Sequence, residues 1–196
     1  QVGDLKIYNA HVAFLVEAVR RTDGYRYYGG LPVDAELVGP DGFEGGDRFG
    51  ELIPTWNLFV LDPDSVEVVS DGSDGEAHIR ATGPTGVFYW TQNNSFVPFE
   101  VVDPELTLTL DYRLGPDDRA LRVTATAVNH GPSVVDLDFP ILLSFQGDGA
   151  FPWLGGHGFE DSPGTKVPYA AAAGRDLSYG WLSADDDLTS LYDYSS

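Results

Sequence analysis

LTLTLDYRL (residues 106–114), the turn GPDD (115–118) and LRVTATAV (121–128) decide the fold of this chain. In the first and last of these segments apolar and polar side chains alternate, which is the two-residue period of a β-strand with one buried face. The proline and the two aspartates between them are typical turn residues. The stretch therefore predicts an antiparallel hairpin that buries one of its faces in a core.

The rest of the chain repeats this strand-and-turn pattern. Short apolar or alternating segments stand at 5–8, 12–16, 31–38, 66–70, 78–82, 134–145, 177–182 and 188–194, and the chain's 23 glycines and 13 prolines are spread between them. Residues 12–21 also permit a helix, but the valines and the phenylalanine at 12–16 favour a strand. Residues 147–164 are too irregular for a regular element. Without a linker or an exact repeat, residues 1–196 are predicted to form a single all-β domain, an antiparallel β-sandwich.

The charge balance narrows the classes of partner. The 31 acidic side chains against 11 lysines and arginines give a formal charge of −20. Nucleic acids and anionic membrane surfaces are bound through basic patches, so we expect no nucleic-acid partner. Three explanations of the acidity stay open: a GC-rich genome, a high-salt environment, and a surface that collects divalent cations. The absence of cysteine excludes disulfides, thiolate metal sites and a cysteine nucleophile.

The location of the protein is predicted from its hydrophobicity and its first residues. No apolar run approaches the roughly 20 residues that cross a bilayer, so we expect no membrane insertion. The sequence starts at Gln1 and contains no methionine, which fits a processed mature protein or an excised domain. We expect an exported protein, extracellular or on the cell surface.

Residues 106–145 resemble the middle of galactose-mutarotase-like β-supersandwich domains. A strand ending in DYRL, the GPDD turn, a strand ending in AVNH and a long strand after it carry the likeness. FQGDGAFPWLGGHGF (145–159) and GRDLSYGW (174–181), with residues 27–35 and 47–54, resemble a domain placed ahead of metallohydrolase modules in large bacterial surface proteins. True mutarotases carry a catalytic histidine on the strand after the asparagine, whereas FPILLSF (139–145) has none. The resemblance therefore implies a supersandwich fold rather than epimerase activity.

An acidic, glycine-rich loop is the candidate metal site. Asp71, Asp74 and Glu76 lie within six residues of one another. Calcium takes several hard oxygen ligands from a flexible loop, so calcium is the one cofactor that this loop would hold. The spacing is not that of an EF-hand, and acidic glycine-rich turns also serve as plain hairpin connections. Both interpretations stay open.

The four histidines have no metal-ligand spacing, so each is expected at a strand edge or in a turn. His157, between two glycines, is the one to test as a base, although the sequence around it supplies no orienting partner.

Aromatic residues in glycine-rich segments form the candidate ligand site. Flat aromatic faces next to polar groups suit sugar rings, which present C–H faces and hydroxyl edges. The alternative is that these side chains pack in the core of a sandwich. The residues predicted to contact a sugar are Tyr27, Tyr28, Trp56, Trp153, His157 and Trp181.

These observations favour a non-catalytic structural or adhesive domain of a surface protein, with weak carbohydrate contact or self-association. Self-association would proceed by donation of the hairpin at 5–16 or the segment 188–194 to a neighbouring copy. The alternative is a carbohydrate-active enzyme, mutarotase-like or glycoside-processing, that uses loop carboxylates.

Overall fold

The computed structural model describes residues 3–21, 27–43, 49–88, 104–137, 141–145, 151–158, 166–173, 177–184 and 188–189. These residues form strands and turns without any helix, and every pairing between strands with a defined register is antiparallel. The prediction of an all-β antiparallel fold is therefore confirmed. The chain divides into two compact units, Gln1–Ser144 and Phe145–Ser196. The prediction that residues 1–196 make one domain stays a prediction.

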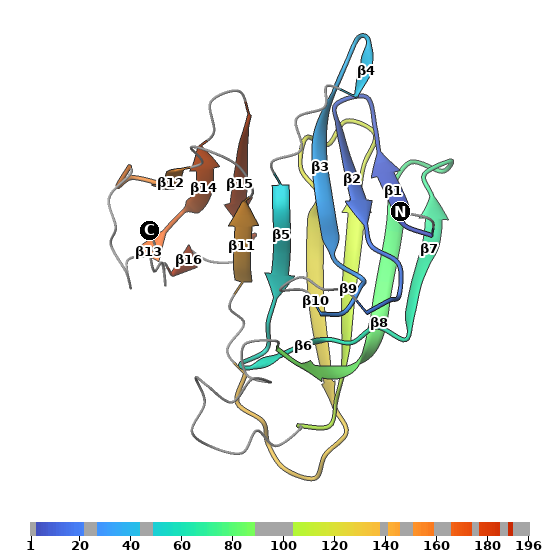
Figure 1. The fold of residues 1–196 in the computed structure, drawn as a ribbon, viewed down its shortest axis with the longest axis vertical. Helices are drawn as coiled ribbons and strands as arrows, with labels where there is room; N and C mark the ends of the chain where they lie inside the picture. Colours follow the sequence, from blue (N-terminus) through green and yellow to red (C-terminus); the bar gives the residue numbers. More distant parts are fainter. Residues whose placement is uncertain are drawn as a thin grey trace. The chain divides into compact units, whose positions relative to one another are not determined.

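The first sheet of the first unit has the order β1-β2-β3-β4 (Figure 1). Its strands are β1 (Leu5–Tyr8), β2 (Val12–Val16), β3 (Pro32–Gly39) and β4 (Gly42–Phe43). The β1–β2 turn is fixed by the Asn9 side chain, whose Oδ1 accepts the backbone N–H groups of His11 and Val12 at 2.8 and 3.0 Å. An asparagine commonly closes a turn in this way. The predicted hairpin at 5–16 is confirmed, and it pairs within its own sheet.

The second sheet contains the hairpin that decides the fold. Its order is β10-β9-β8-β6, with β7 also paired to β8. The strands are β6 (Phe59–Leu61), β7 (Ser65–Asp71), β8 (Ala77–Val87), β9 (Leu106–Leu114) and β10 (Arg122–Asn129). All eight residues of β10 pair with β9 without a shift, so the hairpin predicted from the alternation is confirmed.

Strand β8 is long enough to pair with two different strands along the same edge. Its first half pairs with β7 and its last three residues pair with β6. The turn that joins β6 to β7 crosses β8 at Gly83, where an added Cβ would lie 2.1 Å from the carbonyl oxygen of Asp62. Only glycine leaves room for this crossing.

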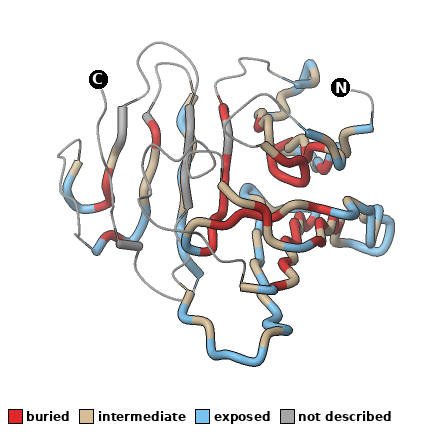
Figure 2. Tube along the Cα trace, turned by 60° about the horizontal axis from the view of Figure 1, so that its bottom comes forward, coloured by how far each residue is buried: buried red, intermediate tan, exposed pale blue. Residues whose placement is uncertain are grey.

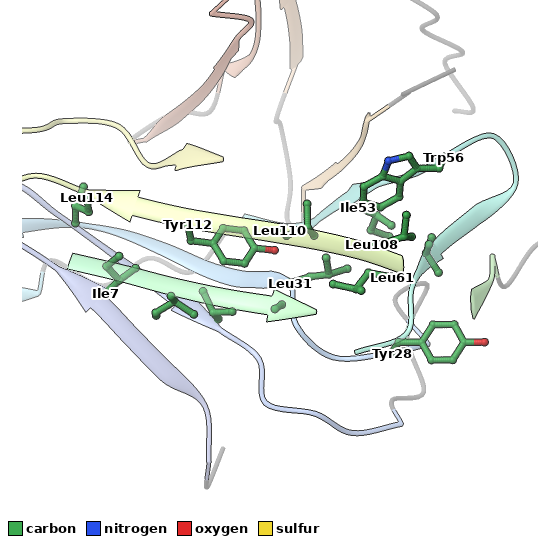
Figure 3. Packing of buried hydrophobic residues seen from close by; sticks show 14 of the residues in the cluster. Ile7, Tyr28, Leu31, Ile53, Trp56, Leu61, Leu108, Leu110, Tyr112 and Leu114 are labelled. Atoms are coloured by element: carbon green, nitrogen blue, oxygen red, sulfur yellow. The ribbon is translucent and has the colours of Figure 1, made fainter. Parts of the chain in front are cut away.

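The two sheets enclose one core, which makes this unit a β-sandwich. Tyr112 is its largest fully buried side chain, and its hydroxyl donates to the carbonyl oxygen of Gly30 at 2.7 Å (Figure 3). Buried residues alternate with more exposed ones along the strands (Figure 2). The buried cluster combines side chains of both sheets and of the segments beside them: Ile7, Val12, Val16, Tyr28, Leu31, Ile53, Trp56, Val60, Leu61, Ile79, Ala81, Leu106, Leu108, Leu110, Tyr112 and Leu114.

One predicted strand of this unit is wrong in its first part. Residues 134–137 are not in a strand, and residues 138–140 lie outside the described residues, while the last part of the segment forms β11 (Ile141–Phe145), the partner of β5 (Phe49–Pro54). Two backbone carbonyls near the segment accept side-chain amides instead of strand partners: Ser133 accepts from Asn129 at 2.8 Å and Asp136 from Asn57 at 3.0 Å. The alternation here does mark a partly buried side, because Leu137 packs against the core while Val134, on the side of Asp136, is 98% exposed, but the backbone of this segment is not in a strand.

The second unit contains two small sheets. The larger has the order β12-β14-β15, from β12 (Phe151–Leu154), β14 (Tyr169–Ala173) and β15 (Ser178–Leu182). The smaller pairs β13 (Lys166–Val167) with β16 (Leu188–Thr189). Residues 190–194 of the second predicted donor segment lie outside the described residues. The prediction that 147–164 holds no regular element is wrong for 151–154.

Candidate functional site

An aromatic pair stands on one face of the three-stranded sheet of the second unit. Trp153 of β12 and Tyr169 of β14 lie on the same face, and the indole Nε1–H donates to the Tyr169 hydroxyl at 3.3 Å. In register, Trp153 lies opposite Ala171, which lies opposite Gly180 on β15. A Cβ added at Gly180 would meet no atom within 4 Å. The rings are therefore flanked by an open strip made of Ala171 and Gly180, and the exposed Leu182 lies opposite Tyr169 on the same face.

The turn after β12 holds this pair in place. Leu154 accepts the N–H groups of His157 and Gly158 at 2.9 Å each, and it donates its own N–H to the Gly158 carbonyl at 2.8 Å. Gly158 has φ of +76°, a left-handed conformation that glycine adopts without strain. At Gly155 a Cβ would lie 2.8 Å from the Tyr169 ring, so the phenol packs directly on the backbone of this turn.

The other two predicted residues of this unit lie apart from the pair in different ways. His157 is exposed in the turn. Trp181 is opposite Ala170, which is opposite Leu154, so its side chain leaves the other face of the sheet from that of Trp153. Trp153 and Trp181 consequently do not form one aromatic surface.

The remaining three predicted sugar-contact residues belong to the first unit. Tyr28 and Trp56 are 7% and 3% exposed, and both are members of the core cluster, so their rings offer almost no face to a ligand. The Tyr28 ring occupies the space above Gly86, where a Cβ would lie 2.4 Å from it. Tyr27 meets Tyr28 edge to face at 5.1 Å, and the guanidinium of Arg21 lies 4.3 Å from the centre of the Tyr28 ring. For Tyr28 and Trp56 the core-packing alternative holds.

The acidic loop does not gather its carboxylates around a common point. The Asp71 carboxylate accepts the backbone N–H of Ser73 at 2.9 Å, and this bond holds the pKa of Asp71 below its usual value. Among the residues that the structure describes, which include Asp71, Asp74 and Glu76, no group of three histidine, cysteine, aspartate or glutamate side chains could hold a metal ion. The arrangement favours the alternative of a plain hairpin connection.

Glu76 instead belongs to a set of ion pairs on the outer face of the second sheet. Arg113 donates to its carboxylate at 3.2 Å, and Arg122 donates to its other oxygen. The bond from Arg113 is the main reason that the pKa of Glu76 lies below its ordinary value. Arg122 also reaches Asp118 at 3.4 Å. These pairs join β8, β9 and β10 to the adjoining turns.

A polar triad with two buried members, His78 and Asp111, and the partly exposed Arg80 adjoins these ion pairs. Arg80 lies opposite Asp111 in register, and its Nε–H donates to Asp111 Oδ1 at 2.8 Å. His78 Nε2 lies 2.5 Å from the same oxygen. Burial alone would raise the pKa of Asp111, but the hydrogen bonds from Arg80 and His78 outweigh it and hold that pKa below its usual value.

The triad cross-links two strands rather than presenting a reactive group. His78 and Asp111 are 4% and 8% exposed, so neither faces solvent as a proton donor or acceptor for a substrate would. The bond to Asp111 also raises the pKa of Arg80, which keeps the guanidinium charged. Charged residues at alternate positions of 78–80 and 111–113 were the sequence signal for this set, but its meaning depends on the pairing of β8 with β9.

No described residue lies in a helix long and apolar enough to cross a bilayer. Comparison of the chain with models of protein families, with curated proteins and with solved structures found no match. Its function must therefore be argued from its own surface.

Proposed function

We propose that this chain is a non-catalytic adhesive module of an exported or cell-surface protein, and that it contacts carbohydrate through Trp153 and Tyr169. One observation carries the proposal: an indole and a phenol, joined by a hydrogen bond of 3.3 Å, flank an open strip of sheet. A pyranose ring stacks its C–H face on such a surface, while its hydroxyls bond to polar groups at the edge.

Two features of the site support contact without turnover. Tyr169 is 37% exposed, and neither Leu182 opposite it nor Ala171 and Gly180 on the same face carries a polar side chain, so these residues offer stacking area rather than a pair of carboxylates. His78 and Asp111, which could act as an acid and a base if they were accessible, contact each other and are buried in the first unit.

Affinity electrophoresis in gels that contain soluble β-glucan, xyloglucan or galactomannan tests the proposal. We expect at least one of these neutral polysaccharides to retard the chain, and Trp153→Ala to lose most of that retardation. Trp181→Ala is the matched control, because it removes a second indole from the same sheet but from the opposite face. Circular dichroism of both variants verifies that the fold is kept.

Two results would overturn this function. Equal retardation of wild type and Trp153→Ala would remove the site. The second result is the release of reducing ends from any of the polysaccharides, lost when loop carboxylates are replaced. It would show that the chain is an enzyme rather than an adhesive module.

A further inference from the structure

A second aromatic surface lies on the first sheet of the first unit, where no sequence pattern drew attention to it. Tyr8 of β1 and Phe43 of β4 are 60% and 49% exposed, and their ring centres are 6.1 Å apart at an angle of 79°. Single exposed apolar side chains are ordinary, but two large rings in contact make a continuous aromatic patch. The rings meet at nearly a right angle, so the patch has the form of a corner.

A charged pair adjoins this corner. The Lys6 ammonium lies 3.2 Å from the centre of the Phe43 ring and 3.6 Å from a carboxylate oxygen of Glu36. The pair places a hydrogen-bond donor and an acceptor beside the rings, and its charges cancel. We refer to Lys6, Tyr8, Glu36 and Phe43 as the aromatic corner.

The corner is built on a sheet rather than on a flexible loop. Tyr8 lies opposite Ala13 of β2, which lies opposite Glu36 of β3. Ala13 is only 1% exposed although its side chain points to the outer face, so the larger groups around it cover it. A site held by three paired strands loses little freedom on binding, because its groups are already in position.

The chemistry of the corner selects the ligand. An anion would meet Glu36 and the chain's formal charge of −20, and a cation would compete with Lys6 for both Phe43 and Glu36. A neutral ligand with neighbouring hydroxyls satisfies both charges, since each hydroxyl donates one hydrogen bond and accepts others. Its apolar C–H face can rest on the exposed part of Tyr8.

We propose that the aromatic corner is a second carbohydrate-contact site, specific for neutral sugars. It rests on the proposed function for the identity of the ligand, but its residues are independent of Trp153 and Tyr169. With one site in each unit, the chain would hold a polysaccharide more tightly than either site holds a short sugar, by raising the effective concentration of the second contact.

The test uses the whole chain and the same gels of β-glucan, xyloglucan and galactomannan. Tyr8→Ala and Phe43→Ala are expected to weaken retardation by roughly tenfold each, the upper range for loss of one aromatic contact. Tyr8→Ala in the Trp153→Ala background is expected to abolish what remains. Val68→Ala is the matched control, because Val68 is 53% exposed but lies on the second sheet. Retardation is expected to persist in about 0.5 M salt, because the ligand is uncharged.

The outcomes separate this inference from the proposed function. If the wild type is retarded and Trp153→Ala weakens it, but Tyr8→Ala and Phe43→Ala do not, only the second site is overturned. If Tyr8→Ala abolishes retardation and Trp153→Ala has no effect, the second site stands and the Trp153 site falls. If no neutral polysaccharide retards the wild type, both fall. If salt abolishes the retardation, or only a sulfated polysaccharide is bound, the neutral-ligand specificity is wrong.

Discussion

Replacement of Tyr112 by phenylalanine measures how much one buried hydroxyl contributes to the sandwich. The ring is fully buried and its hydroxyl donates at 2.7 Å to the carbonyl of Gly30, which is itself buried. Burial raises the pKa of Tyr112, so the hydroxyl is protonated and donates throughout the range in which proteins fold. Phenylalanine keeps the ring contacts, so Tyr112→Phe isolates the hydrogen bond.

The expected loss of stability comes from the buried carbonyl that Tyr112→Phe leaves without its donor. Without the hydroxyl the Gly30 carbonyl has lost a buried donor, which costs about 1–3 kcal/mol. For a unit of this size that lowers the melting temperature by about 4 °C per kcal/mol. Urea unfolding followed by circular dichroism measures the change as a lower midpoint with an unchanged slope. Hydrogen exchange adds a local measure, because the Gly30 N–H bonds to Glu17 at 2.9 Å and should exchange faster.

Tyr8→Phe is the control for this measurement. Tyr8 is 60% exposed, so removal of its hydroxyl is expected to change the free energy of unfolding by less than about 0.5 kcal/mol. If the free energy of unfolding of Tyr112→Phe also stays within about 0.5 kcal/mol of the wild type, a buried water or a local shift must replace the hydroxyl. The hydrogen bond would then not be what joins β9 to the segment at Gly30.

Three further predictions concern charge and backbone space in the first unit. Arg20→Met removes the cation between the buried carboxylates of Asp4 and Glu17, and it should destabilise the unit by about 3–5 kcal/mol in urea; a loss below about 1 kcal/mol would show that water reaches them. Gly83→Ala places a Cβ against the backbone of the crossing turn and should cost about 1–3 kcal/mol or more, measured by thermal unfolding; an unchanged melting temperature would mean that the turn moves freely. The folded-state pKa of Asp111 lies below its unfolded value, so its ionised form contributes stability above the unfolded pKa that is lost as the pH falls through the folded one. In Asp111→Asn the free energy of unfolding should therefore fall less steeply than in the wild type between about pH 5 and pH 2. An equally steep fall in both proteins would assign the loss of stability in acid to other carboxylates.

The sequence predicted strands well where apolar side chains line one side of a strand and polar side chains line the other. In residues 106–127 the strand side chains on the core side are apolar and those on the outer side are polar, so the alternation predicts the strands and the side that each one buries. The turn at Asn9 was equally predictable, because a local side-chain bond closes it. Residues 134–137 have the same alternation and Leu137 packs partly against the core, yet they are not in a strand, and no local signal distinguishes the two cases.

The candidate site was less predictable because it depends on which strands pair. Trp56 and Trp153 both follow a proline by one or two residues in the sequence, yet the first is 3% exposed in the core and the second lies on an open sheet face. Tyr169 was not predicted, since its contact with Trp153 arises only from the β12–β14 register. Likewise, the corner of Tyr8 and Phe43 joins residues 35 positions apart in the sequence.

The ion pairs of the first unit bear on the proposal that the ligand of this chain is uncharged. Within the described residues, six of the chain's basic side chains each lie within 4 Å of a carboxylate: Lys6, Arg20, Arg21, Arg80, Arg113 and Arg122. These six cations connect strands and turns of the first unit. At any of these six cations an anionic ligand would have to break an existing ion pair to gain a new one, which returns little free energy at the surface. Aromatic faces carry no such cost, because stacking on them displaces only water. This use of the cations agrees with the proposal that Trp153, Tyr169 and the aromatic corner contact a neutral sugar.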